Sequence, residues 1–338
     1  MHRAPTMRAV AALAGVSLKT VSRVVNREPG VSQELLDRVD DAIRLLDYRH
    51  NATASSLRRA DRRTSTIGLL LDDVSNPFSS TLNRAIEDVA RERETLVFAG
   101  SSDGDPEREA QFVRALAARQ VDGLIVMPAA LDHGTLLRER HGGLPMVFVD
   151  RLSISTEVDS VIADNRGGVR QAIHHLARRG HERIGFLGDL STIWTAEERY
   201  LGYVEGLAIE GLRLNPELVR RDARGTQAAE LAALHLLLLP DPPTALFASQ
   251  NLLTFGAIRA IRSQSKHTRV ALIGFDDFPL ADMLSPPVTV VAQDPQTIGQ
   301  TAARRLFARL DGDESPGQQI SVPTQLIERG SGELSRGD

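Results

Sequence analysis

The sequence predicts an α/β protein in which a small helical head precedes a larger body of parallel sheets. From Ile67 onward, short apolar strands alternate with amphipathic helices, a pattern typical of parallel sheets covered by helices on both faces. Residues 6–48 instead read as three short helices. The alternation in the body extends over more strands than one sheet needs. We therefore expect two lobes with a cleft between them.

Length and composition favour a folded protein of two or three domains. The chain has 338 residues, 42% of them hydrophobic, and no cysteine. The lack of cysteine excludes disulfides, thiolate catalysis and zinc ribbons, and it fits the reducing cytoplasm, where we expect the protein to work. Residues 1–15 lack the apolar core of a signal peptide, and no apolar run approaches the length of a membrane span. No cofactor or metal site is expected.

The charge is divided unequally along the chain. Residues 1–63 contain twelve Lys and Arg against seven Asp and Glu, a net charge of +5, whereas the remainder carries −9. A basic head on an acidic body indicates that the head alone meets a polyanion.

The helices of the head have the layout of a helix-turn-helix. Thr6 can cap the first helix, Gly15 makes the turn, and Ser17 can cap the second. In such a motif the start of the second helix faces base edges while its apolar side packs inward. The alternative is a plain three-helix core with solvated charges.

The second helix offers suitable side chains for reading DNA. Leu18 can touch a thymine methyl group, and Lys19 and Arg23 can donate to guanine. Phosphate contacts are expected from the polar residues around them: Ser17, Thr20, Ser22 and Asn26.

The segment "VAALAGVSLKTVSRVVNREPGVSQELLDRVDDAIRLLDYRHNATASSLR" resembles the head of the lactose-repressor family of bacterial transcription regulators. The resemblance places Leu18 and Lys19 on the two variable base-reading positions of the family and Arg23 on a near-constant base contact. It implies a helix-turn-helix DNA-binding domain over 1–49 and a hinge helix or linker over 50–65.

In this family the hinge segment folds on DNA, and one copy from each subunit enters the minor groove. Leu57 matches the leucine that wedges between base pairs, and Ala54 lies at the close-approach position. An isolated helix of this length is marginal in water, in agreement with folding on DNA. The alternative is a flexible linker with an incidental leucine.

The predicted strands and helices of the body follow one another from residue 67. The strands are expected at 67–73, 95–102, 122–128, 146–151, 160–165, 183–189, 244–250 and 270–277. The helices between them include 77–93, 106–119, 166–179, 196–211, 227–238 and 251–263. Polar residues cluster at the strand ends, where open α/β sheets bind ligands: Asp72, Asp150, Asp164, Gln250 and Asp276.

The body also resembles the family's effector-binding core, which is similar to periplasmic sugar-binding proteins. The resemblance rests on motifs in a fixed order, including "SNPF" (75–78), "FVDR" (148–151), "RYLGY" (199–203) and "LIGFDD" (272–277). It implies a two-lobed, periplasmic-binding-protein-like core with doubly wound parallel sheets over 66–331, which binds the effector and dimerises. Residues 332–338 are expected to be a disordered tail.

The resemblance places a ligand pocket between the lobes. Arg199 matches a ligand-clamping arginine and Asp276 a ligand-binding aspartate, groups that suit polyhydroxylated ligands. The remaining matched pocket positions are Phe78, Asp150, Thr195 and Gln250. Alternatively, Arg199 pairs with a neighbouring carboxylate and Asp276 caps a turn. Trp194 is expected either near the rim, where it could stack on a sugar, or as an exposed loop residue or core filler.

These observations predict a repressor of carbohydrate-metabolism genes that binds a palindromic double-stranded DNA operator and responds to a small-molecule effector, which we expect to be a sugar or sugar derivative. One head covers few base pairs, so we expect a homodimer, and a tetramer also fits the sequence. The basic head argues against the alternative of a transport-type binding protein. An enzyme is not expected because neither phosphate-binding glycine loops nor a G-x-S-x-G elbow occurs. His174 and His175, inside a helical pattern, are expected on a helix surface.

Overall fold

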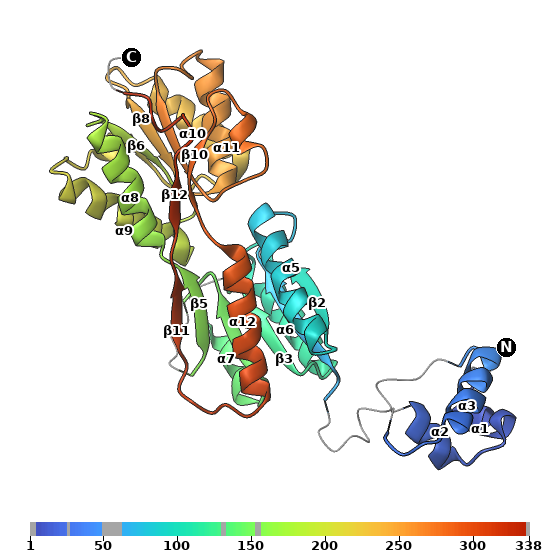
Figure 1. The fold of residues 1–338 in the computed structure, drawn as a ribbon. Helices are drawn as coiled ribbons and strands as arrows, with labels where there is room; N and C mark the ends of the chain where they lie inside the picture. Colours follow the sequence, from blue (N-terminus) through green and yellow to red (C-terminus); the bar gives the residue numbers. More distant parts are fainter. Residues whose placement is uncertain (1–4, 26–27, 49–62, 130–132, 153–156, 336–338) are drawn as a thin grey trace. The chain divides into compact units, whose positions relative to one another are not determined.

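The computed structural model describes residues 5–25, 28–48, 63–129, 133–152 and 157–335. The chain divides into two compact units, with the boundary between Thr64 and Ser65. In the described part, the smaller unit contains three helices and the larger unit contains two six-stranded sheets (Figure 1).

The smaller unit is a helix-turn-helix with a third helix across it. Its helices are α1 (Met7–Ala14), α2 (Leu18–Val25) and α3 (Gln33–Leu46). Thr6 accepts a hydrogen bond from the Ala9 amide at the start of α1, as predicted. Gly15 ends α1 with φ of 63°, a conformation that glycine adopts without steric cost. Val21 and Val24 of α2 are buried in the common core of the three helices, so the opposite side of α2 faces outward.

The first lobe of the larger unit is a six-stranded sheet in which every strand pair is parallel. The strand order is β11-β5-β4-β3-β1-β2. Its strands are β1 (Thr66–Leu71), β2 (Leu96–Ser101), β3 (Gly123–Val126), β4 (Met146–Val149), β5 (Asp159–Ala163) and β11 (Gln319–Val322). Its helices are α5 (Pro77–Glu92), α6 (Pro106–Ala118), α7 (Gly134–His141) and α12 (Pro295–Leu310).

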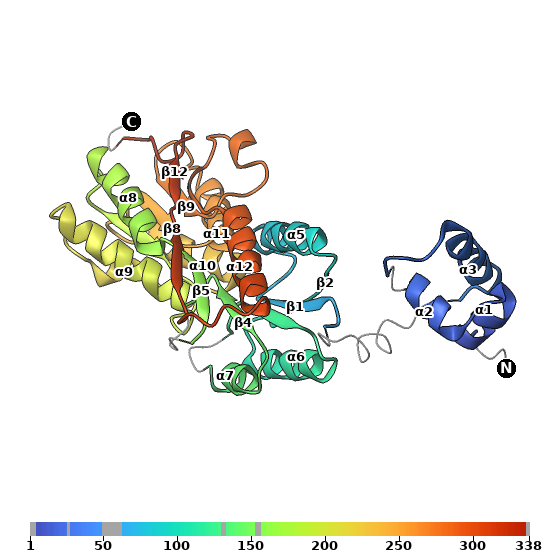
Figure 2. The same ribbon diagram turned by 60° about the horizontal axis from the view of Figure 1, so that its bottom comes forward.

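The side chains of β1 show why helices cover both faces of this sheet. Ile67, Leu69 and Leu71 are buried against α5 and α12, whereas Leu70 is buried against α6 on the opposite face. Figure 2 shows α5 and α12 on one side of the sheet and α6 and α7 on the other. At Gly68 a Cβ atom would lie 2.4 Å from the Leu116 side chain, so only glycine lets α6 approach this closely.

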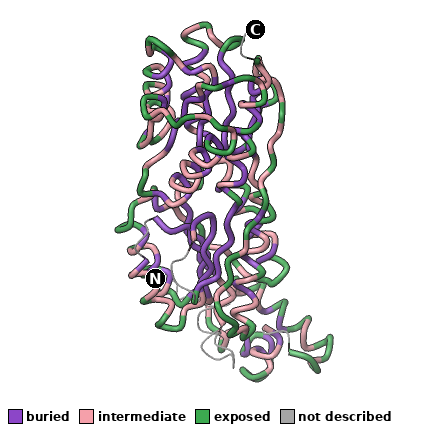
Figure 3. Tube along the Cα trace, turned by 90° about the vertical axis from the view of Figure 1, so that its left-hand side faces the viewer, coloured by how far each residue is buried: buried purple, intermediate pink, exposed green. Residues whose placement is uncertain are grey.

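The second lobe repeats this layered arrangement. Its strand order is β12-β10-β9-β8-β6-β7, and β12 runs antiparallel to β10 at one edge. The strands are β6 (Ile184–Leu187), β7 (Val219–Arg220), β8 (Ala245–Ala248), β9 (Ala271–Phe275), β10 (Thr289–Ala292) and β12 (Gln325–Ile327). The helices are α8 (Asn165–Arg178), α9 (Trp194–Ile209), α10 (Gly225–Leu237) and α11 (Asn251–Ser263), with short 3-10 turns η1 (Pro216–Leu218) and η2 (Ala281–Met283). Buried residues follow the strands of both lobes (Figure 3).

Three crossings connect the lobes: between β5 and α8, between β10 and α12, and between β11 and β12. Asp164 stands at the first crossing, where its carboxylate accepts a hydrogen bond of 2.8 Å from the Gly167 amide and caps α8. The expectation that Asp164 joins the ligand-facing group is therefore wrong, because its side chain is used at the helix start.

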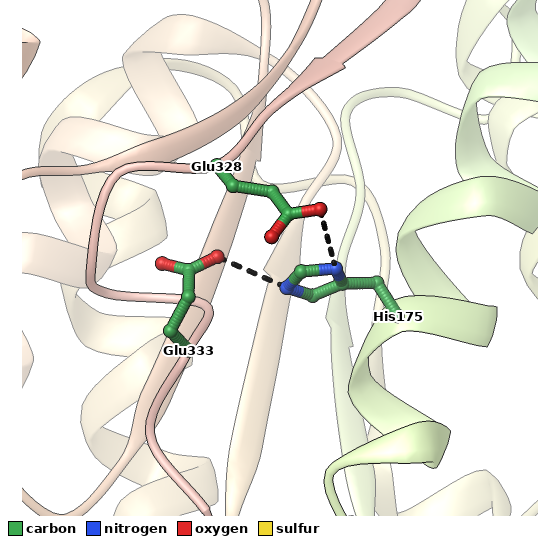
Figure 4. Close-up of side chains that lie close together, drawn as sticks. All are labelled: His175, Glu328 and Glu333. Carbon is green, nitrogen blue, oxygen red and sulfur yellow. Dashed lines mark hydrogen bonds and ion pairs between the residues drawn. The ribbon is translucent and has the colours of Figure 1, made fainter.

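The prediction of a disordered tail from residue 332 is wrong for residues 332–335. The Glu333 carboxylate accepts a hydrogen bond from Thr289 Oγ1 at 2.8 Å and lies 3.0 Å from His175 Nε2 (Figure 4). The Leu334 side chain packs against the core of the second lobe. His175 is only 6% exposed, so its expected place on the helix surface is also wrong. Both errors have one cause, since the C-terminal segment covers this part of α8.

Candidate DNA interface and ligand pocket

Helix α2 presents the predicted DNA-reading residues at its start. Leu18 is 44% exposed although it is apolar, and Lys19 beside it is exposed as well. The hydroxyl of Ser17 accepts a hydrogen bond of 3.1 Å from the Thr20 amide, so Ser17 caps α2 as predicted. Ser22 is partly buried further along the helix. The arrangement leaves the first turn of α2 accessible to a groove of DNA.

Arg23 is held by contacts within the head. Its Nη2 donates to the Pro29 carbonyl at 2.8 Å, and its Nε lies 3.4 Å from the Glu28 carboxylate. A contact with a base would require the guanidinium to exchange these partners. The other predicted DNA contacts, Asn26, Ala54 and Leu57, lie outside the described residues.

The larger unit has a pocket between its two lobes, and all six predicted ligand residues line it: Phe78, Asp150, Thr195, Arg199, Gln250 and Asp276. Asp150 follows β4 of the first lobe, whereas Gln250 and Asp276 follow β8 and β9 of the second. The carboxyl ends of parallel strands from two sheets thus meet at one place, which is where doubly wound folds bind ligands.

Arg199 is one of two buried cations in the described lining of this pocket and is only 5% exposed. Its Nε donates to Asn165 Oδ1 at 2.8 Å, and its Nη1 donates to the Ser249 carbonyl at 2.7 Å. The guanidinium lies 3.9 Å from the centre of the Phe275 ring. Its Nη1 is 3.8 Å from the Asp276 carboxylate, too long for a direct hydrogen bond. These contacts fix the plane of the guanidinium at the pocket wall.

Asp150 and Asp276 share a backbone feature at the ends of their strands. Both adopt left-handed conformations, with φ of 64° and 72°, which are uncommon outside glycine. Asp276 Oδ1 accepts a hydrogen bond of 2.5 Å from Gln293 Nε2. Burial raises the pKa of Asp150 above its ordinary value, although Arg199 and Arg151 act in the opposite direction. An ionised Asp150 is therefore incompletely compensated by the protein itself.

Sequence reasoning missed several residues that line the pocket, among them Arg151, Asp189 and Gln293. Arg151 is buried, donates to the Pro128 carbonyl, and has its Nη2 3.6 Å from Asp72. Burial also raises the pKa of Asp189. Arg151 directly follows Asp150, and Asp189 ends the predicted strand 183–189. Both residues therefore lie beside features that the sequence already predicted for the site.

Trp194 lies beside the pocket and not in it. The indole lines a smaller neighbouring recess with His133 and Leu152. Trp194 begins helix α9 and is partly buried, so the alternative of an exposed loop residue is wrong, while Ile193 lines the pocket.

Two contacts bridge the lobes near the pocket. The amides of Asn76 and Asn251 form reciprocal hydrogen bonds of 3.2 and 2.9 Å. Arg224 of the second lobe donates to the Asp103 carbonyl at 2.7 Å and lies 3.7 Å from the Asp72 carboxylate. These bridges stabilise the lobe arrangement in which the pocket residues converge.

A second polar cluster joins His175, Glu328 and Glu333, whose potential ligand atoms lie within 4.8 Å of one another. Arg179 already donates to His175 Nδ1 at 3.2 Å and to Glu328 at 3.4 Å. Arg179 thus pairs with two of the three side chains, and the cluster fastens the C-terminal segment to α8. None of the helices in the described residues is both long and apolar enough to cross a membrane.

Comparison with known proteins agrees with this architecture. Residues 6–51 match the family of bacterial regulatory proteins, lacI family, and residues 173–332 match the periplasmic binding protein-like domain. The transcriptional repressor CytR of Escherichia coli K12 is 30% identical over 330 residues, covering 97% of this chain and 96% of that protein. The transcriptional regulator RegA of Clostridium saccharobutylicum is 32% identical and covers 97% of this chain and 99% of that protein.

Solved structures are similar over nearly the whole chain. The lac repressor dimer bound to operator and the anti-inducer ONPF has a TM-score of 0.87 and 26% identity, covering 98% of this chain and 100% of that one. The complex of the transcriptional regulator CelR with cellobiose has a TM-score of 0.72 and 30% identity, covering 97% and 99%.

The helix-turn-helix head and the two-lobed body define a DNA-binding transcriptional regulator and not an enzyme. The chain belongs to the lacI family of bacterial regulatory proteins, and relatives such as CytR are described as transcriptional repressors.

Proposed function

We propose that this repressor binds a pseudo-palindromic operator as a homodimer and is released from it by a small polyhydroxylated effector held between the lobes. Its targets in this proposal are genes of carbohydrate metabolism, and its place is the cytoplasm, where the chromosome lies. The observation that carries the proposal is the convergence of Asp150, Arg199 and Asp276 in one interlobe pocket.

The DNA-reading role rests on the exposed start of α2. Leu18 and Lys19 stand where side chains of a recognition helix reach base edges, and Arg23 stands one turn further along. Ser17 and Thr20 lie at the same end and suit phosphate contacts. Leu57, with Ala54, supplies the minor-groove wedge in this proposal.

The homodimer is supported by apolar side chains left exposed on the larger unit. Leu96 and Phe98, on the edge strand β2, are 67% and 47% exposed, and Leu280 and Met283, around η2, are 64% and 76% exposed. Single exposed apolar residues are ordinary, but large ones on an unpaired strand edge are a liability unless covered. A two-fold axis that covers them also places two heads on a palindrome.

The effector class is supported by the donors and acceptors of the pocket. Carboxylates and a fixed guanidinium bind adjacent hydroxyl groups in planar, paired fashion. One solved relative is described as a cellobiose complex, and another, from Enterococcus faecium, as containing bound ribose. An effector controls DNA binding only if it prefers one lobe arrangement, which a pocket shared by both lobes provides.

Selection of binding sites from random DNA tests the operator claim. We expect a two-fold symmetric consensus whose half-sites change when Leu18 and Lys19 are replaced together, and sedimentation showing a dimer at micromolar concentration. An asymmetric consensus bound by a monomer would refute the dimer.

A further inference from the structure

The pocket has an excess of negative charge. Five carboxylates line it (Asp72, Asp73, Asp150, Asp189 and Asp276), against two guanidinium groups (Arg151 and Arg199). The excess is therefore three negative charges, and Arg224, which pairs with Asp72 from outside the pocket, reduces it to two. Helices α5, α9 and α11 begin at the pocket, and each N-terminus acts as about half a positive charge. Adding these three partial charges to the side-chain charges still leaves the pocket with a small net negative charge.

The negative charge is concentrated at a buried carboxylate that the protein leaves unpaired. Asp150 is 6% exposed and lines the pocket, and among the described residues no hydrogen bond or ion pair engages its carboxylate. The charges around it are of both signs, with Arg199 and Arg151 opposing Asp276 and Asp72. The Asp150 oxygens are not among the fully buried side-chain atoms that lack a partner, so they are accessible in the pocket, where a ligand that donates hydrogen bonds to them is favoured.

The unsatisfied polar atoms of the pocket are mainly acceptors. Gln293 donates its amide nitrogen to Asp276, which leaves Gln293 Oε1 as a buried acceptor without a partner. Asp72 Oδ1 is buried and likewise accepts no hydrogen bond. On the donor side, Arg151 Nε is unsatisfied among the described residues of the lining, and the buried Ser249 hydroxyl, which also lacks a partner, can donate or accept. With Gln250 Oε1 as a third buried acceptor that lacks a partner, these atoms favour a ligand that donates hydrogen bonds.

We propose that the effector is an uncharged or cationic molecule rich in hydroxyl or amino donors, and that Asp150 and Asp72 exclude sugar phosphates and sugar acids. The inference rests on the proposed function of the pocket and specifies its ligand. An anionic group would face carboxylates in a site where burial weakens screening. Neutral sugars and amino sugars satisfy the same acceptors without that repulsion.

Calorimetric titration of the full chain with matched sugars tests the ligand rule. The probes are glucose, glucosamine, glucose 6-phosphate and glucuronate, with ribose, ribose 5-phosphate and cellobiose as a second series. We expect any anionic member to bind at least 100-fold more weakly than its neutral parent, and Asp150→Asn to narrow that ratio at least tenfold. An anionic member that binds as tightly as its parent overturns the proposal. Glucosamine against glucose separates a cationic from a neutral effector.

A second arm needs no ligand. Because burial disfavours the Asp150 charge and Arg199 and Arg151 compensate it only in part, Asp150→Asn should raise the melting temperature of the ligand-free protein at pH 7.5 by several degrees, and the gain should shrink toward pH 4. Asp164→Asn is the matched control: it ends a strand of the same lobe, but its carboxylate caps α8, and asparagine keeps an acceptor there. An Asp150→Asn variant no more stable than wild type overturns the proposal even if no sugar in the panel binds. A raised melting temperature with no effect of any sugar on DNA binding would instead contradict the proposed function alone.

Discussion

The reciprocal amide pair between Asn76 and Asn251 predicts how strongly the lobes hold each other. The two hydrogen bonds are 3.2 and 2.9 Å long, and Asn251 is fully buried. Each such bond contributes about 0.5–1.5 kcal/mol net. Asn251→Ala should therefore weaken the described lobe arrangement by about 1–3 kcal/mol, which changes its population ratio about 5–150-fold.

Each asparagine also serves its own lobe, so the interlobe share must be isolated. Asn76 Oδ1 accepts from the Phe78 amide, and Asn251 Oδ1 accepts from the Leu252 amide. A double-mutant cycle with Asn76→Ala removes these contributions. Since either substitution alone breaks both interlobe bonds, the effect of the double variant should be smaller than the sum of the single effects.

The assay is a distance measurement by pulsed electron paramagnetic resonance. Because the chain has no cysteine, spin labels attach only at cysteines that are introduced. Two exposed positions are suitable, Glu92→Cys in the first lobe and Arg213→Cys in the second. When doubly labelled chains are diluted in excess unlabelled chains, so that each homodimer carries at most one labelled chain, wild type should give one dominant intrachain distance, and Asn251→Ala should add a second population. An unchanged distribution in the single variants would refute the view that this pair holds the lobes together.

Three further perturbations have distinct expected outcomes. Leu57→Ala should weaken specific operator binding more than tenfold by fluorescence anisotropy, and unchanged affinity would reject the wedge. Arg199→Ala should remove the pocket guanidinium together with its two hydrogen bonds, to Asn165 and Ser249. By calorimetry it should weaken about 10–100-fold the binding of any sugar that binds wild type, and equal affinity would mean that Arg199 serves only the fold. Glu333→Gln should lower the free energy of unfolding at pH 7 by about 1–3 kcal/mol, because Glu333 fastens the C-terminal segment. Burial alone would raise the pKa of Glu333, but hydrogen bonds from His175 and Thr289 lower it below 4.5. The loss of unfolding free energy in Glu333→Gln should therefore shrink as the pH falls from 4.5 through the pKa of Glu333 in the folded protein. A loss that does not depend on pH would contradict this role of the Glu333 carboxylate.

Much of the pocket could be predicted from the sequence because several pocket residues lie at the ends of predicted strands. Asp72, Asp150, Gln250 and Asp276 directly follow apolar strands, and parallel strands bring their carboxyl ends to one edge. Arg199 lies inside a helix, where periodicity assigns no role, so only the family resemblance pointed to it.

Contacts between distant segments were beyond the reach of sequence patterns. Asn76 and Asn251 are 175 positions apart, and no local signal pairs them. The segment after Ser331 is polar and glycine-rich, which predicts disorder, yet Glu333 reaches His175, 158 positions away. The antiparallel edge strand β12 is three residues long, too short for a reliable periodicity.

The most direct test of the account is anisotropy of the full chain on DNA from its own upstream region, in a salt series with and without the matched sugars. The account predicts a steep salt dependence, a preference over scrambled DNA, and loss of specific binding with one neutral or amino sugar. Operator affinity that stays unchanged with a sugar shown by calorimetry to occupy the pocket would contradict ligand-gated repression.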